Sequence, residues 1–337
     1  MASSHVGLRA PLTFTPLLKD YLWGGDRLVR LLGRNLPDGA IAESWEISGY
    51  PGTASVVDGG PLKGRDLPGL VADYGVDLVG RRGRWAVERG MFPLLIKLLD
   101  ASHALSVQVH PDDEYAAAHH PGEVGKTEMW YILHAEAGAR IIHGLSPGID
   151  RAALRRAVSE GRLQDCLNRV AVRPGDSVLV PAGTVHGILS GIVLVEVQQS
   201  SDRTYRIHDW DRVGPDGAPR PLHLDRALDV IDFKSVPALV EPRLAAAGGG
   251  WRREVVAECD DFVVERVGVE AGAVFEADLD GETFEAWGVL SGSASLLTAH
   301  DRAMHMEVAR FALLPATMGP FALRAATDVV ALRAYLP

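Results

Sequence analysis

Residues 105–115 read LSVQVHPDDEY, and the runs GKTEMWYIL and PGDSVLVPAGTVHGIL follow at 125–133 and 174–189. β-Branched and aromatic residues between Gly and Pro turn signals are typical of short strands. Gln108 and His110 are two apart on the first run. In an extended strand both side chains point to the same face, about 6 to 7 Å apart along the chain. The first run therefore predicts a strand that presents two potential metal ligands together.

Two further potential ligands stand on the other runs. Glu128 lies near the start of the second run, and His186 follows the turn Pro181-Ala182-Gly183 of the third. Two neutral imidazoles and a carboxylate form an open metal site, and an added amide oxygen biases it toward zinc, manganese or iron. The residue types leave the choice among these metals open. The predicted ligands are Gln108, His110, Glu128 and His186.

Composition sets the protein class. The 337 residues are 47% hydrophobic and 23% charged, which fits a globular protein long enough for two domains. The formal net charge of −10 is spread without a basic stripe, so nucleic acid and anionic membranes are not expected partners. We see no signal-peptide pattern and no run of about eighteen apolar residues, and we expect a cytoplasmic protein. The oligomeric state stays unknown at this point.

Short β runs separated by Gly and Pro favour an antiparallel sandwich or barrel, so the predicted fold is mainly β. One segment, residues 149–170, departs from this β pattern. Its apolar residues recur at helical spacing, and Asp150 is a candidate N-cap. Residues 66–74 and 222–230 also have helical patterns. We therefore expect a sheet structure with a helical excursion in its first half.

Pro and Gly residues between 236 and 250 predict a linker that forms neither helix nor strand. A second β-patterned unit follows at 251–337. Its run EVARFALLPATMGPFAL resembles PGDSVLVPAGTVHGIL of the first unit, with Pro320 and Phe321 near the place of His186. The two units are thus expected to be variants of one architecture, the second without a metal.

Seven motifs together resemble the class I, zinc-dependent mannose-6-phosphate isomerases of the short bacterial type, in the cupin superfamily. They occur in family order over residues 1–233, and their combination is specific although each alone is not. The second half resembles only a degraded cupin barrel. The motifs are YLWGGDRL (21–28), AESWEIS (42–48), PLLIKLLDA (93–101), LSVQVHPDDEYA (105–116), GKTEMWYIL (125–133), PAGTVHGI (181–188) and QQSSDRTYRIHDWDR (198–212).

The resemblance implies two cupin-type β-barrels, or jelly rolls. The first, over 1–235 with a helical insertion near 149–170, would be the catalytic metal-binding domain. The second, over 251–337, would be a degenerate domain without metal. The implied reaction converts mannose 6-phosphate to fructose 6-phosphate and back, with Zn²⁺ held by residues that match Gln108, His110, Glu128 and His186. Another divalent metal remains possible.

The chemistry of an aldose-ketose isomerase agrees with these residues. A proton moves between C1 and C2 through a cis-enediolate, whose charge a divalent cation stabilises. The resemblance implies that Arg206 is catalytic; a guanidinium stays charged, so it would stabilise the oxyanion or assist ring opening. Arg203 lies in the same element but out of phase. Lys126, a histidine or metal-bound hydroxide could carry the proton.

Three residues are candidates for the phosphate of a hexose 6-phosphate. Ser106 shares the strand face of Gln108 and His110, and Lys126 is two before Glu128. Lys97 lies in the apolar run PLLIKLL, where a lysine needs a cleft or a partner. The alternative for Lys97 is an ion pair with Asp100 or Glu43.

Other functions remain open because one fold hosts many functions. The chain could bind a sugar phosphate without turnover, or isomerise another phosphosugar. A cupin oxygenase would keep the metal ligands but would need no cationic phosphate pocket.

Overall fold

The computed structural model is mainly β, as predicted. Strands hold 40% of the chain and helices 16%, whereas a typical globular domain has more helix than strand. No helix among the residues that the structure describes is long and apolar enough to span a membrane. The described residues are 8–37, 39–214, 217–235, 238–299 and 303–337.

The first half of the chain forms two packed sheets, which we call the first sheet pair. The strand order is β10-β7-β12-β5-β3-β2 in the six-stranded sheet and β13-β6-β11-β8-β9 in the five-stranded sheet. Trp130, Leu194 and Ile188 contribute to one buried cluster between them. The strands are β2 (Leu17–Lys19), β3 (Glu43–Ser48), β5 (Leu94–Ala101), β6 (Val107–Val109), β7 (Glu128–Ala135), β8 (Arg140–Leu145), β9 (Leu167–Ala171), β10 (Ser177–Val180), β11 (His186–Ile188), β12 (Ile192–Gln199) and β13 (Tyr205–His208). Outside this pair, β1 (Phe14–Thr15) and β4 (Val56–Val57) form a two-stranded sheet.

The second half forms a similar pair of sheets, the second sheet pair. Its orders are β14-β15-β16-β23-β18-β21 and β17-β22-β19-β20. Trp287, Phe275 and Phe321 belong to the buried cluster between these sheets. The strands are β14 (Arg243–Gly248), β15 (Trp251–Glu258), β16 (Val263–Val269), β17 (Val274–Leu279), β18 (Glu285–Ser291), β19 (Ala294–Thr298), β20 (Met304–Met306), β21 (Phe311–Leu314), β22 (Gly319–Ala325) and β23 (Val329–Tyr335).

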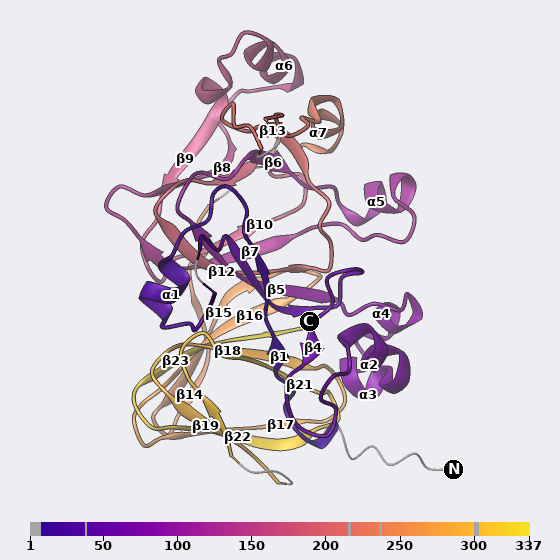
Figure 1. Ribbon diagram of the computed structural model, residues 1–337, viewed down its shortest axis with the longest axis vertical. Coiled ribbons are helices and arrows are strands. Elements are labelled where there is room, and N and C mark those ends of the chain that lie inside the picture. The colour runs from indigo at the N-terminus through magenta and orange to yellow at the C-terminus, as the bar shows by residue number, and fades with distance from the viewer. Residues whose placement is uncertain (1–7, 38, 215–216, 236–237, 300–302) are drawn as a thin grey trace.

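The two six-stranded sheets pack against each other and form the central core. Ile96 and Val195 of the first pair lie in one buried cluster with Val264 and Leu332 of the second. Figure 1 shows the second pair, in orange and yellow, beneath the first. Within the described residues no sheet closes on itself by hydrogen bonds, so each half of the chain forms a pair of packed sheets, and the cupin-type barrels remain a prediction.

The strand order of the two pairs is the same, as the repeated sequence runs predict. β10, β7, β12 and β5 follow one another in the first six-stranded sheet as β21, β18, β23 and β16 do in the second. The registers agree as well: Val180, just before Pro181, pairs with Glu128, and Leu314, just before Pro315, pairs with Glu285. Glu285 thus occupies the place of Glu128 in the second pair.

Helices are present in all three segments where the sequence predicts them. Those of 149–170 and 222–230 lie beside the first sheet pair, whereas the helix of 66–74 lies beside the second in Figure 1. Asp150 caps α6 by accepting a hydrogen bond from the backbone N–H of Ala153 at 2.7 Å, as expected. The helical excursion ends at Cys166, because the residues after it form β9. The helices are α1 (Arg27–Leu32), α2 (Leu67–Tyr74), α3 (Val76–Val79), α4 (Arg84–Glu88), α5 (Asp113–His119), α6 (Arg151–Ser159), the 3₁₀ helix η2 (Leu163–Cys166) and α7 (Leu224–Val230).

The linker expected over 236–250 needs a correction. Arg243–Gly248 forms β14, which pairs with β15 in the second sheet pair. Gly249 and Gly250 both have positive φ, 54° and 80°, and join the two strands in a tight turn. Two-residue hairpin turns of this hand favour glycine at both positions. The prediction of neither helix nor strand is therefore wrong here; residues 236–237 lie outside the described part of the chain.

Candidate active site

Three predicted ligands meet between the two sheets of the first pair. Glu128 and His186 begin β7 and β11, and His110 directly follows β6. Their ligand atoms lie within 4.8 Å of one another, and each residue is only 1% exposed. His110 Nε2 lies 3.4 Å from Glu128 Oε2, and His186 Nε2 lies 3.3 Å from Glu128 Oε1. The spacing suits three ligands of one ion.

Hydrogen bonds to the backbone orient both imidazoles. His110 Nδ1 lies 2.8 Å from the carbonyl oxygen of Arg203, and His186 Nδ1 lies 2.8 Å from that of Thr184. A carbonyl only accepts, so each Nδ1 donates and each neutral ring turns a bare Nε2 toward the centre. Burial lowers the pKa of His110 to about 3 and also lowers the pKa of His186. Both rings are therefore neutral at pH 7, the form that binds metals.

The Glu128 carboxylate is ionised in the same place. Burial raises its pKa, but Lys126 and the two imidazoles outweigh that effect and hold the pKa well below its usual range. Lys126 Nζ forms an ion pair with Oε2 at 3.0 Å. His110 Nε2 and both Glu128 oxygens otherwise lack a hydrogen-bond partner among the described residues. Buried polar atoms without partners are costly, and a cation between them would satisfy all three.

Gln108 reaches the same centre from β6. It lies across from His186 in the sheet, and its Nε2 is 3.3 Å from His186 Nε2. Its Oε1 accepts a hydrogen bond from Ser106 Oγ at 2.9 Å. Rotating the amide by half a turn exchanges its oxygen and nitrogen without moving the chain. The oxygen would then face the centre, as the predicted ligand set requires.

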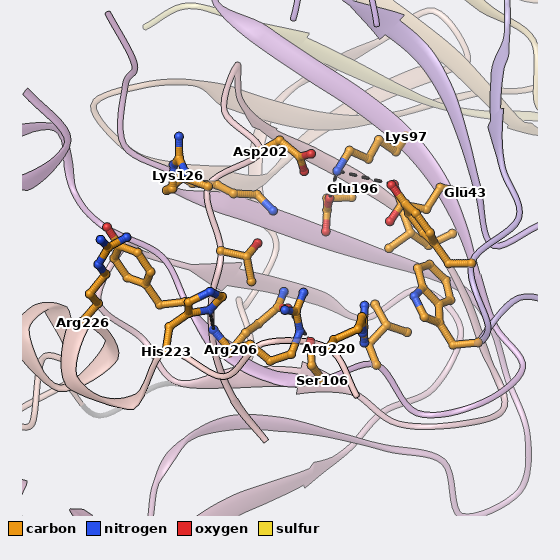
Figure 2. A pocket seen from close by; sticks show the side chains of 18 residues that line it. Glu43, Lys97, Ser106, Lys126, Glu196, Asp202, Arg206, Arg220, His223 and Arg226 are labelled. Carbon is orange, nitrogen blue, oxygen red and sulfur yellow. Dashed lines mark hydrogen bonds and ion pairs between the residues drawn. The ribbon is translucent and has the colours of Figure 1, made fainter. Parts of the chain in front are cut away.

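A cavity of about 470 Å³ adjoins this cluster. Ser106, Gln108 and Lys126 line it, and Figure 2 shows Ser106 and Lys126 among the labelled side chains around the cavity. Basic side chains outnumber acidic ones, so the cavity suits an anion although the whole chain is acidic. The basic lining residues are Lys97, Lys126, Arg203, Arg206, Arg220 and Arg226, and the acidic ones are Glu43, Glu196 and Asp202.

Lys97 lines the cavity but is held between two carboxylates. Its Nζ lies 3.1 Å from Glu196 Oε1 and 3.7 Å from Glu43 Oε2. Burial lowers the pKa of Lys97, yet the carboxylates outweigh this and raise it. Glu43 was one of the two partners offered by the sequence, whereas Asp100, the other, pairs with Arg27 at 3.2 Å. Glu196 was missed.

Replacing Lys97 with methionine is expected to lower the free energy of unfolding by about 3 to 5 kcal/mol, because two buried carboxylates lose their counter-charge. Equilibrium unfolding in urea measures the loss. Lys19→Met is the matched control: Lys19 Nζ also lies 4.8 Å from the Trp45 ring, but it pairs with no described carboxylate. Equal losses in both variants would assign the effect to the Trp45 contact.

Arg206 and Arg203 differ in their partners. Arg203 Nε donates to Glu123 Oε2 at 3.0 Å, so its charge is neutralised. Arg206, on β13, donates to the carbonyl oxygen of Pro221 at 3.1 Å and pairs with no described carboxylate. Its Nε is buried without a described partner. Burial lowers the pKa of Arg206, yet a guanidinium remains charged near neutral pH.

Besides Glu196, sequence reasoning missed three basic or imidazole residues of the cavity wall, which all lie in the stretch RPLHLDRALD (220–229). Arg220 pairs with Asp209 at 2.7 Å, and Arg226 lies on α7 without a described ion pair. Burial first, and then the charges of Arg206 and Arg226, lower the pKa of His223. Three basic or imidazole residues within seven positions were the available signal.

Comparisons with known proteins point in one direction. Residues 12–129 match the family described as phosphomannose isomerase type I, catalytic domain. Mannose-6-phosphate isomerase ManA of Bacillus subtilis is 42% identical over 227 residues, which cover 67% of this chain and 70% of that protein. Mannose-6-phosphate isomerase of Streptococcus mutans is 41% identical over 66% of this chain and 67% of its own length.

The fold comparison covers nearly the whole chain. A crystal structure of the mannose 6-phosphate isomerase from Bacillus subtilis superimposes with a TM-score of 0.87 at 31% sequence identity. The match covers 97% of this chain and 100% of that one. Both sheet pairs therefore belong to the shared fold.

Proposed function

The chain belongs to the type I phosphomannose isomerases, and from this premise we propose that a divalent metal ion held by the buried ligands assists its reaction. It is an isomerase of mannose 6-phosphate. The observation that carries the metal proposal is the convergence of His110, Glu128 and His186 beside a basic cavity that Gln108 and Lys126 line.

The metal would be held by those three residues and by Gln108 after rotation of its amide. Two imidazoles, a carboxylate and an amide oxygen suit zinc, which we propose, and also manganese or iron. When bound, the ion supplies Lewis-acid stabilisation to negative charge on the substrate oxygens. Rotation of the Gln108 amide also frees the Ser106 hydroxyl hydrogen, because Nε2 then donates to Ser106 Oγ.

Lys126 and Arg206 are the proposed catalytic residues. The reaction moves a proton between C1 and C2, and charge develops on both neighbouring oxygens in the cis-enediolate. Arg206 lacks a described carboxylate partner, so its guanidinium is available to stabilise this charge. Lys126 Nζ lies in the cavity wall, 3.0 Å from Glu128 Oε2, where an ammonium can exchange a proton with a substrate oxygen.

We propose that the phosphate binds toward the arginines and Ser106. Glu43 and Glu196 flank Lys97 and would repel a phosphate there, so Lys97 is better suited to orient Glu196 and to meet a sugar hydroxyl. Arg226 has no described ion pair and Arg220 adds a second guanidinium, whereas Arg206 is the residue proposed for the charge on the C1 and C2 oxygens. Planar guanidinium groups match phosphate oxygens in pairs.

We propose further that each sheet pair is a cupin-type jelly roll, with the chemistry in residues 1–235. In the second pair the Arg333 guanidinium forms an ion pair with Glu285, which stands at the place of Glu128. Arg333 Nη1 also lies 2.8 Å from Glu265. A fixed cation thus already neutralises this carboxylate, which supports a metal-free role for residues 251–337.

The experiment is a coupled assay of purified protein with mannose 6-phosphate and other hexose 6-phosphates, with metal content measured on the same sample. We expect fructose 6-phosphate from mannose 6-phosphate, loss of activity with a chelator, and recovery on adding Zn²⁺. Fully metallated protein that binds these sugars without turning any over would favour a binding protein. Full activity in metal-free protein would contradict the metal proposal.

A further inference from the structure

Residues 125–127 contain Lys126 and lead into Glu128, the first residue of β7. They form no strand, yet hydrogen bonds hold the backbone of each of them. The Gly125 N–H donates to Asp113 Oδ1 at 2.6 Å, and the Lys126 N–H donates to the carbonyl oxygen of Pro111 at 3.0 Å. A Cβ on residue 125 would lie 2.6 Å from backbone atoms of Asp112 and Asp113, so the close approach requires glycine. These contacts tie the segment to the chain that follows His110.

The main chain of the next residue, Thr127, is held by Gln199. Its side-chain hydroxyl contacts Asp261 and accepts a hydrogen bond from the Ala182 N–H at 3.4 Å. The Thr127 N–H donates to Gln199 Oε1 at 2.8 Å, and the Gln199 N–H donates to the Thr127 carbonyl oxygen at 3.1 Å. Both main-chain polar groups of the residue before Glu128 thus depend on Gln199. Gln199 is the last residue of β12 and is only 4% exposed.

The second sheet pair fixes the Gln199 side chain. Gln199 Nε2 donates to Asp261 Oδ1 at 2.9 Å and to Asp113 Oδ1 at 3.2 Å. Ionised carboxylates only accept hydrogen bonds, so Gln199 Nε2 must face them. Gln199 Oε1 therefore faces the Thr127 N–H. Asp261 lies between β15 and β16, in the half of the chain that contains none of the candidate ligands.

Asp261 occupies an unfavourable place for a carboxylate. Burial, and then the charges of Asp113 and Asp260, raise its pKa to about 6. A hydrogen bond from the Thr127 side chain acts in the opposite direction and lowers this pKa, and the Gln199 amide donates to the same carboxylate. A hydrogen bond to a charged group is stronger than one between neutral groups, so this contact can hold the amide firmly.

We propose that Gln199 and Asp261 are positioning residues through which the second sheet pair holds residues 125–128 in place. This inference rests on the proposed metal centre, because the groups that it says are positioned are the ligand Glu128 and the neighbouring Lys126. Metal ligands must be held within about 0.5 Å of their working geometry, and outer contacts of this kind supply that precision. The second sheet pair thereby contributes to the site without contributing a ligand.

The test compares Asp261→Ala with two matched variants of the full-length protein. Asp261→Asn keeps an oxygen that can accept from Gln199, and Asp260→Ala removes a neighbouring carboxylate that makes no described hydrogen bond. We expect Asp261→Ala to bind Co²⁺ about tenfold more weakly, with an altered visible spectrum and a lower kcat at similar KM. Asp261→Asn should have a Co²⁺ affinity, a visible spectrum and a kcat close to those of the wild type. Asp260→Ala should also resemble the wild type.

Amide hydrogen exchange in metal-free protein gives a second readout. Asp261→Ala should speed exchange at Thr127 relative to Asp260→Ala, because the Gln199 amide and the Thr127 hydroxyl both lose Asp261 as a partner. Equal exchange and equal Co²⁺ binding in the two alanine variants would overturn the proposal. If the wild type binds no metal, the proposed metal centre fails, and the exchange at Thr127 alone decides the positioning role.

Discussion

Replacing His186 with alanine is expected to strip the protein of its metal and to remove its isomerase activity. The ring supplies one of three buried ligand atoms, and Glu128 would keep its charge with one fewer partner. Changes in outer contacts weaken metal binding by about 10 to 100-fold, so loss of a direct ligand should exceed about 100-fold. Metal analysis after dialysis and the coupled assay measure the two effects.

His143→Ala is the matched control for this variant. His143 is equally buried and lies directly across from His186 in the five-stranded sheet. Its Nε2 contacts the carbonyl oxygen of Leu179 at 3.1 Å, and His143 is not among the three residues whose ligand atoms meet. We expect this variant to lose stability but to keep its metal. Metal retention by His186→Ala, or equal loss in both variants, would contradict the assigned ligand set.

Replacing Arg206 with alanine is expected to leave the metal bound and to lower kcat about 10² to 10³-fold. This is the usual cost of removing one donor that stabilises developing negative charge. Arg206 contacts none of the three buried ligands, so their geometry should persist. Arg206→Lys should recover part of the rate, because lysine keeps the charge but lacks the planar fork.

Arg203→Ala controls for loss of a positive charge in the same wall of the cavity. Glu123 already neutralises Arg203, and its contact with His110 runs through the main chain, which alanine keeps. We expect less than about a tenfold change in kcat. An unchanged rate in Arg206→Ala would remove its catalytic role and leave the metal centre standing.

The ligand cluster could be predicted because its signals are local. Gln108 and His110 are two residues apart, so a strand presents them on one face. His186 follows the turn signal Pro181-Ala182-Gly183, which can be recognised from residue type. The N-cap Asp150 was found for the same reason. The hairpin at Gly249 and Gly250 was misread as a linker, since glycine pairs are typical of both flexible segments and tight turns.

Sequence reasoning could not predict which cations in the cavity are neutralised. Lys97 and Glu196 are ninety-nine residues apart and meet because β5 and β12 pair in one register. A shift of one residue would turn either side chain to the opposite face of the sheet. The same holds for Arg203, whose partner Glu123 lies eighty residues away.

The sequence by itself determined the family, the mainly β fold, the candidate ligands and the N-cap of α6. The family rests on seven motifs in one order, whereas the fold, the candidate ligands and the cap rest on residue spacing within short runs. Only the tertiary structure decided that Lys97 is paired while Arg206 is available, and that Asp261 reaches Gln199 from the second sheet pair. Ion pairs and hydrogen bonds act over about 3 Å, so they depend on strand register and sheet packing that bring distant residues together.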